Sequence, residues 1–244
     1  MSGGDVAAPT RDLGSELPND GFENLPSVLR AKMDRFAELL LERNASVNLT
    51  AARSRDAIFE HVRDSLSIVP YLSEPFVDIG SGGGFPAIPL AIATGYRGVL
   101  IEAVAKKARF LEDAIRELDL PLDVRIARAE DAGRDPSLRG TFASATARAV
   151  SSLPTVLELT LPLLGIGGLA VLQRGRLDER ERTAAVDAAL VLGAAIENEV
   201  AVGADEDERR VVLVRKTGPT GPRFPRRAGI PAKRPLCYER GADD

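Results

Sequence analysis

The sequence predicts an α/β protein: a mostly parallel, doubly wound sheet of seven strands, with helices on both faces and a helical cap before the first strand. Short apolar runs alternate with helical patterns through the middle of the chain, which is typical of such sheets. Two helix-like stretches precede the first run. Four glycines within residues 80–84 separate that run from the next helical pattern. In open α/β sheets this turn is where ligands bind.

The N-terminal part of the chain divides into two regions. Residues 1–23 are rich in glycine, proline and charge and have no apolar period, so we expect a disordered tail. Residues 24–72 should form the helical cap. From Leu25 to Arg43 the apolar residues recur at spacings of three and four, which predicts one helix. A second helix is expected from Asp56 to Val69.

The main domain is expected over residues 73–217. Its clearest helix is Lys106–Leu118. The last two strands are joined by an acidic loop, so they should be antiparallel. The seven expected strands are PFVDI, GVLIEA, LDVRIA, FASATAR, GLAVLQ, Ala195–Val202 and Arg210–Arg215.

Composition excludes several classes of protein. With one cysteine, Cys237, and one histidine, the chain has neither an internal disulfide nor the ligands for a Cys/His metal cluster, so we expect no metal. No apolar run reaches membrane-spanning length, and a reducing cytoplasm fits best. The net charge of −4 argues against a general nucleic-acid coat protein.

The charge is unevenly distributed. Between Arg215 and Arg234 there are seven Lys or Arg residues and no Asp or Glu. Residues 218–244 therefore form a basic, proline-rich C-terminal segment. It either binds the phosphates of a nucleic acid or is a solvated tail whose charges aid solubility.

The glycine loop separates two classes of cofactor. A dinucleotide fingerprint aligned on Gly80 and Gly82 would need glycine or alanine at position 85, where the chain has Phe85. The pattern from Asp78 through Gly84 instead resembles the cofactor loop of Rossmann-like S-adenosylmethionine methyltransferases. Glu102, at the end of the second strand, is placed to accept both hydroxyls of a ribose. The alternative is a tight turn that binds no ligand.

The chain also carries a set of motifs that resembles one family, the small-subunit rRNA guanine-N7 methyltransferases called RsmG or GidB. The match runs from about Asn44 to Leu236. Its parts are NLT, HVRDSL, DIGSGGGFPAIPLA, IEAVAKKARFL, ARAED, ARAVSSLP and FPRRAGIPAKRPL. The resemblance implies a Rossmann-like methyltransferase fold, S-adenosyl-L-methionine as cofactor, and N7 of a guanosine in 16S rRNA as target.

The resemblance also implies a set of site residues. Asp78 would lie at the methionine end of the cofactor, Glu102 at its ribose, and Ala129 and Glu130 beside its adenine. The implied cofactor-binding residues are Asp78, Gly80, Gly82, Gly84, Phe85, Glu102, Ala129, Glu130 and Arg148.

The expected chemistry requires no general base, because N7 of guanine carries an exposed lone pair. No catalytic residue is therefore assigned, although Arg148, at the end of the fourth strand, is a candidate for positioning the substrate. The alternative for Arg148 is a surface salt bridge. We interpret His61 as structural and facing Asp64, three residues along a helix. Arg174 stands where relatives commonly have lysine.

The target base must be presented in a loop or pulled from a helix, because side chains cannot read the deep major groove of an RNA duplex. The expected partner is 16S rRNA within the small ribosomal subunit, and the protein is expected to be a monomer with no membrane association. Five basic residues are candidates for holding the RNA: Arg223, Arg226, Arg227, Lys233 and Arg234.

Two further functions stay open. One is methylation of a small molecule, and the other is RNA binding or assembly without catalysis. Deletion of Arg223–Asp244 is expected to separate the rRNA and small-molecule enzymes by reducing rRNA methylation while cofactor binding survives.

Overall fold

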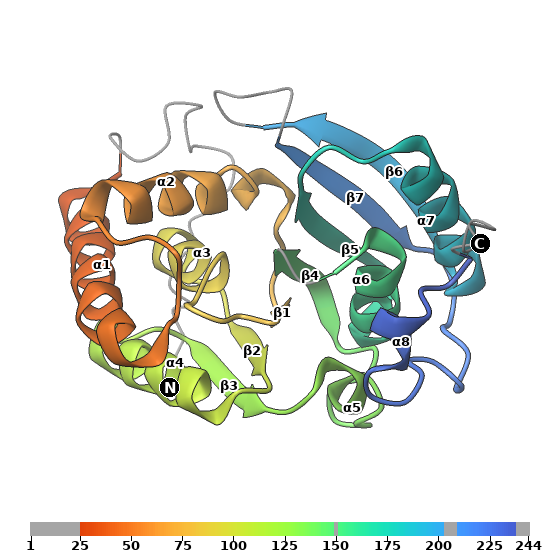
Figure 1. Cartoon of the computed structure of the whole chain (residues 1–244), viewed down its shortest axis with the longest axis horizontal. Helices are drawn as coiled ribbons and strands as arrows, with labels where there is room; N and C mark the ends of the chain where they lie inside the picture. Colours follow the sequence, from red (N-terminus) through yellow and green to blue (C-terminus); the bar gives the residue numbers. More distant parts are fainter. Residues whose placement is uncertain (1–24, 149–150, 203–208, 238–244) are drawn as a thin grey trace, which may run out of the picture.

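The computed structural model describes residues 25–148, 151–202 and 209–237, and these contain one seven-stranded sheet. The strands lie in the order β3-β2-β1-β4-β5-β7-β6 (Figure 1). The expected tail at residues 1–23 lies outside the described residues. The strands are β1 Phe76–Ile79, β2 Gly98–Glu102, β3 Leu122–Ile126, β4 Phe142–Arg148, β5 Leu164–Arg174, β6 Ala194–Ala201 and β7 Arg210–Lys216.

The first five strands are parallel to one another, whereas β7 runs antiparallel to both β5 and β6. The prediction of a mostly parallel sheet with an antiparallel end is confirmed. The chain passes from β6 back into the space beside β5, so β7 lies inside the sheet and β6 forms its edge. The carboxyl ends of β1, β2, β3 and β4 consequently share one edge of the sheet.

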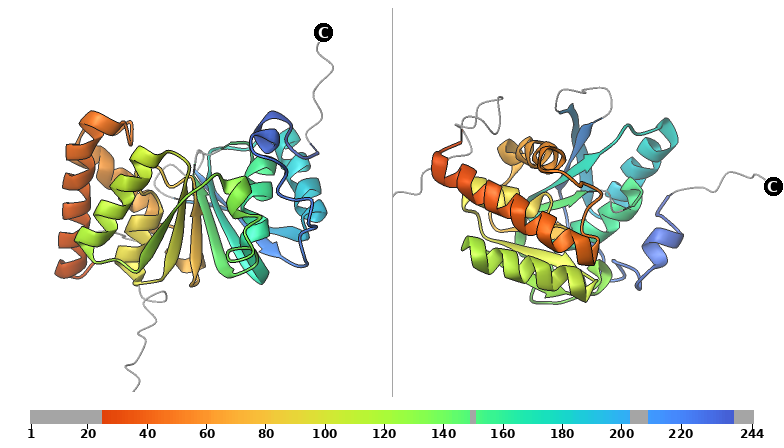
Figure 2. Two further views of the ribbon diagram at one scale, coloured as in Figure 1. Left: turned by 90° about the horizontal axis from the view of Figure 1, so that it is seen from below. Right: turned by 60° about the vertical axis from the view of Figure 1, so that its left-hand side comes forward.

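Helices cover both faces (Figure 2). The chain before β3 supplies the helices of one layer, and the chain after β3 supplies those of the other. The helices of the first layer are α1 Ser27–Val47, α2 Arg55–Leu66, α3 Ala87–Thr94 and α4 Ala105–Leu118. Those of the second are α5 Ala129–Ala132, α6 Leu153–Thr160, α7 Glu179–Val191 and α8 Ile230–Lys233. Within the described residues, no helix is both long and apolar enough to cross a membrane.

Alternation along the strands supplies both cores. Phe76 of β1 is fully buried among the helices of the first layer, while Val77 and Ile79 are buried in the second. Successive strand residues point to opposite faces, so a strand that is apolar throughout must be covered on both sides. Burying each such side chain stabilises the fold by about 1.5–3 kcal/mol.

The cap helices differ from the sequence expectation at their ends. Helix α1 continues to Val47, beyond the expected Arg43. The buried Asn44 side chain supports this end of the helix by hydrogen bonding to the backbone of the loop that follows. Its Oδ1 accepts from the backbone N–H groups of Leu49 (2.7 Å) and Thr50 (3.0 Å). Helix α2 starts with the Ser54 side chain accepting from Ala57 and ends at Leu66, before the expected Val69.

Among the described residues, no helix or strand crosses the expected boundaries between residues 72 and 73 and between residues 217 and 218. A 3-10 turn, Val69–Tyr71, ends before residue 72, and β7 ends before residue 217. The C-terminal segment then returns across the second helical layer and adds helix α8, which the sequence did not predict.

Candidate functional site

The glycine loop leaves β1 and turns into α3 at the carboxyl edge of the sheet. Gly80, Gly82 and Gly84 have φ angles of 72°, 52° and 93°, in the left-handed region that favours glycine. A Cβ at Gly84 would stand 2.7 Å from Cδ1 of Ile88. The loop is therefore built from glycine for both conformation and space.

Glu102, at the end of β2, joins the glycine loop to its own loop. Its Oε2 accepts from the Gly82 N–H at 2.9 Å, and its Oε1 accepts from the Val104 N–H at 2.7 Å. The residue is only 6% exposed. Each carboxylate oxygen keeps a second lone pair, so Glu102 can still accept hydroxyl groups.

The loop after β3 lies beside Glu102. The Ala127 N–H donates to the Glu102 carbonyl at 3.2 Å, and α5 starts with Ala129 and Glu130 immediately afterwards. The Glu130 side chain is buried, and its Oε1 accepts from the backbone N–H of Gly229 at 2.7 Å. This contact with the C-terminal segment was not predicted.

Asp78 is the most unusual group of the site. It is fully buried in β1, and its Oδ1 accepts from the Thr146 hydroxyl at 2.8 Å. Its Oδ2 has no hydrogen-bond partner among the described residues. Burial raises the pKa of the Asp78 carboxyl to about 6, against opposing hydrogen bonds from Ser81 and Thr146. A buried acceptor without a partner is costly, and a ligand ammonium group would satisfy it.

Phe85 and Arg148 are in contact beside the glycine loop. Phe85 is buried, in edge contact with Phe36 and His61. The Arg148 guanidinium lies 5.0 Å from the centre of the Phe85 ring. At such a distance a cation is attracted to the ring face. Phe85 therefore contributes a packed aromatic surface beside the glycine loop.

Arg148 is held from α2. Its Nη1 lies 3.2 Å from Oδ2 of Asp64, and both side chains are largely buried. Asp64, which we expected to face His61, forms this ion pair and a longer one with Arg209 at 3.9 Å. The backbone carbonyl of Asp64 accepts from the Gln173 amide at 2.7 Å. Burial, and then the nearby Arg148 charge, lower the pKa of His61. The Asp64 charge also acts on His61, where it raises the imidazole pKa against these stronger lowering effects.

Arg174 fixes the chain that follows β4. It donates to the Ser151 carbonyl, and its Nη2 lies 2.9 Å from Oε1 of Glu181 in α7. The same carboxylate oxygen accepts from the Leu153 N–H at the start of α6. The planar guanidinium thus bridges two backbone segments, which a lysine ammonium would do with less defined geometry.

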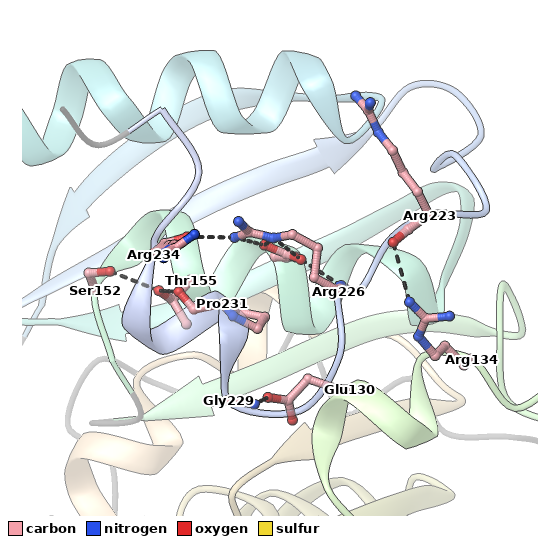
Figure 3. Close-up of polar contacts among 10 residues, drawn as sticks. Glu130, Arg134, Ser152, Thr155, Arg223, Arg226, Gly229, Pro231 and Arg234 are labelled. Carbon is pink, nitrogen blue, oxygen red and sulfur yellow. Dashed lines mark hydrogen bonds and ion pairs between the residues drawn. The ribbon is translucent and has the colours of Figure 1, made fainter.

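The predicted RNA-binding cations are not equivalent. Arg226 forms an ion pair with the fully buried Glu158, with Nη2 and Oε2 2.6 Å apart (Figure 3). The other four side chains are exposed, and Arg223 lies over the ring of Phe224. The exposed four are Arg223, Arg227, Lys233 and Arg234.

These groups fit S-adenosylmethionine. Among the described residues nothing pairs with Oδ2 of Asp78, which could accept from the ammonium group, and Glu102 offers acceptors for the ribose hydroxyls. The glycine loop lets the ligand approach the backbone between them.

The family model described as rRNA small subunit methyltransferase G matches residues 29–212 of the chain. A protein of that name from Pelotomaculum thermopropionicum is 38% identical, over 91% of this chain and 98% of the relative. Another from Desulfitobacterium hafniense is 40% identical, over 92% and 93%. A third, from Chloroflexus aggregans, is 42% identical over 84% and 90%.

Solved structures agree on the fold. A Bacillus cereus O-methyltransferase in complex with S-adenosylhomocysteine has a TM-score of 0.55 and 21% identity, covering 80% of this chain and 94% of that one. A Thermus thermophilus branched-chain polyamine synthase mutein with 5′-methylthioadenosine has a TM-score of 0.58 and 16% identity, over 89% and 70%. The expected Rossmann-like methyltransferase fold is confirmed. Given the family model and the close relatives, this chain belongs to the rRNA small subunit methyltransferase G family, GidB, of S-adenosylmethionine-dependent methyltransferases.

Proposed function

We propose that this protein transfers the methyl group of S-adenosylmethionine to N7 of a guanosine in 16S rRNA, acting as a monomer on the small ribosomal subunit in the cytoplasm. The observation that carries the proposal is the buried Asp78 carboxylate, whose Oδ2 has no hydrogen-bond partner among the described residues. It lies at the same sheet edge as Glu102 and Arg148, in a chain of this family. The carboxylates would bind the cofactor, and Arg148, at the end of β4, would face the substrate.

In the proposed complex, Asp78 binds the ammonium group of the cofactor and Glu102 its ribose, while Ala129 and Glu130 line the adenine. The bound cofactor supplies an electrophilic methyl on a sulfonium centre. Phe85 and the glycine loop would hold it in one orientation, since transfer depends on aligning the methyl with the attacking nitrogen.

Arg148 is proposed to position the guanine. The base gains positive charge as N7 takes up the methyl, so an unpaired cation at its side would oppose the reaction. Asp64, at 3.2 Å from Arg148, offsets that charge. The pair therefore offers directed N–H donors, and no proton has to be removed from the base.

The exposed cations of the C-terminal segment are proposed to hold phosphates near the target base. Such contacts position RNA without reading its sequence, and they make binding depend on salt. The recognised nucleotide is then selected by the shape of the assembled subunit.

The proposal is tested by methyl transfer from labelled S-adenosylmethionine to small subunits from a strain lacking this protein, followed by nucleoside analysis. The expected product is 7-methylguanosine in 16S rRNA, lost with Asp78→Ala. Cofactor binding without labelling of subunits or rRNA would contradict the proposed substrate and favour a small-molecule methyltransferase. RNA binding that is unaffected by Asp78→Ala, with no methylation by either protein, would indicate a non-catalytic assembly module.

A further inference from the structure

The segment from Gly221 to Leu236, which we call the C-terminal strap, is built into the second helical layer. Phe224 is 4% exposed and packs in the core of that layer. Arg139 donates to the carbonyls of Gly133 (2.7 Å) and Phe224 (2.8 Å), so one guanidinium joins the strap to the end of α5. The start of the strap is thus part of the fold.

The centre of the strap is held by Arg226. Its backbone N–H and Nε donate to Oε1 of Glu158 at 2.7 and 2.9 Å, and its Nη2 lies 2.6 Å from Oε2. The same Nη2 donates to the Arg234 carbonyl at 2.7 Å, which closes the strap on itself (Figure 3). Glu158 is fully buried in α6. A buried carboxylate needs such a partner, because removing the guanidinium would leave its charge uncompensated.

Beyond Arg226 the strap contacts the chain that follows two different strands. The Gly229 N–H donates to Oε1 of Glu130, in α5 after β3, at 2.7 Å. The Pro231 carbonyl accepts from the Thr155 hydroxyl at 2.9 Å, near the start of α6 after β4. Arg227 and Lys233 lie on either side of these contacts with their side chains exposed. One short segment therefore bonds to the predicted site residue Glu130 and to α6, and it also carries exposed cations.

We propose that the strap is a working part of the cofactor site: Arg226 is a positioning residue that places the Gly229 amide on Glu130, and the strap couples RNA binding to cofactor affinity. The RNA half of this proposal rests on the proposed function. Two ligands that favour the same placement of one segment must increase each other's affinity, and by the same factor. Deletion of the strap should then weaken cofactor binding, contrary to the sequence-based expectation for Arg223–Asp244.

The first test compares two variants that separate the buried and exposed cations. Arg226→Lys keeps the net charge, and hence the long-range attraction for RNA, but it loses the fork on Glu158. We expect its dissociation constant for S-adenosylhomocysteine, measured calorimetrically without RNA, to rise about tenfold, the effect of losing one hydrogen bond to a charged group.

The matched control is the double variant Arg227→Ser, Lys233→Ser. Without RNA, it should bind S-adenosylhomocysteine within about twofold of the parent protein, because neither side chain reaches the site. Its KM for small subunits should rise while kcat changes little. An unchanged dissociation constant in a folded Arg226→Lys variant would overturn the proposal.

The second test uses the unaltered protein and holds even if Arg226→Lys fails to fold. Hydrogen exchange of the backbone amides of residues 226–234 is followed with and without S-adenosylhomocysteine. We expect saturating ligand to slow exchange in this segment by at least about threefold. Unchanged exchange would overturn the proposal. Slowed exchange together with unmethylated subunits would support the cofactor role of the strap and contradict the proposed substrate instead.

Discussion

Replacing Asp78 with asparagine should stabilise the protein and abolish its affinity for the cofactor. The ionised carboxylate is destabilising in the ligand-free protein because it is fully buried and its Oδ2 has no partner among the described residues. Asparagine keeps an oxygen for the Thr146 hydroxyl and carries no charge. It cannot, however, pair with a ligand ammonium group by charge.

The size of the effect follows from the pKa. A rise from the usual 3.8 to about 6 means that the native state binds the Asp78 proton more tightly than the unfolded state does. The free energy of unfolding therefore falls as pH rises through this window, by about 3 kcal/mol at 1.36 kcal/mol per unit. Above about pH 7 the loss is complete. Asp78→Asn carries no charge and does not suffer this loss of free energy of unfolding. Its buried amide group lacks a partner, however, which costs about 1–2 kcal/mol at every pH.

Urea unfolding of both proteins from pH 4.5 to 8 measures this difference. Asp78→Asn should gain relative to the parent protein as pH rises toward 7, and then the difference should level off. The matched control is Glu102→Gln, which places an amide against the Gly82 or Val104 N–H groups and should lose stability at every pH. A stability difference for Asp78→Asn that does not change with pH would refute the electrostatic reasoning.

Three other predictions concern the same edge of the sheet. Below about pH 6, the dissociation constant for S-adenosylhomocysteine should rise by up to about tenfold per pH unit, because the ligand ammonium group must displace the Asp78 proton; calorimetry across pH tests this. Gly84→Ala should lower the free energy of unfolding in urea by about 2–3 kcal/mol, because its Cβ would stand 2.7 Å from Ile88. The control is Gly95→Ala, which is also at positive φ but has open space around it. It should lose only about 1 kcal/mol in the same titration. Arg148→Lys should lower kcat on small subunits by at least about tenfold with little change in cofactor affinity, which single-turnover kinetics and calorimetry separate.

The order of the main elements along the chain, and the antiparallel direction of the last two strands, were predictable from the sequence because they depend on local patterns. Alternating apolar runs specified the strands, and the short acidic connection specified the antiparallel pair at the end of the sheet. The ends of helices were less predictable, because they depend on tertiary contacts. Helix α1 extends past Arg43 through the Asn44 side chain, whose partners lie in the following loop.

The site was predictable where one residue type does one local task. The φ angles of the loop require glycine. The acid at the end of β2, Glu102, can be located from its distance in sequence to the glycine loop. The partners of Arg148, Arg174 and Arg226 are 84, 7 and 68 residues away in sequence, and no local spacing indicates such pairs. For the same reason the sequence predicts Arg226 only as an RNA-binding cation, whereas its partner Glu158 in α6 is fully buried.

Two acids of the site differ in how far the fold already satisfies them, and this difference indicates where cofactor affinity arises. Glu102 accepts backbone N–H groups with both oxygens, so ribose hydroxyls add to an arrangement that is already stable. Asp78 keeps one buried oxygen that has no partner among the described residues, so a ligand ammonium group there would remove a cost that the ligand-free protein carries. Binding and pKa are linked here, because the same ligand that satisfies the carboxylate also favours its ionised form. If Asp78 and Glu102 bind the cofactor as proposed, affinity at the methionine end would come largely from removing this cost, whereas affinity at the ribose end would come only from new hydrogen bonds.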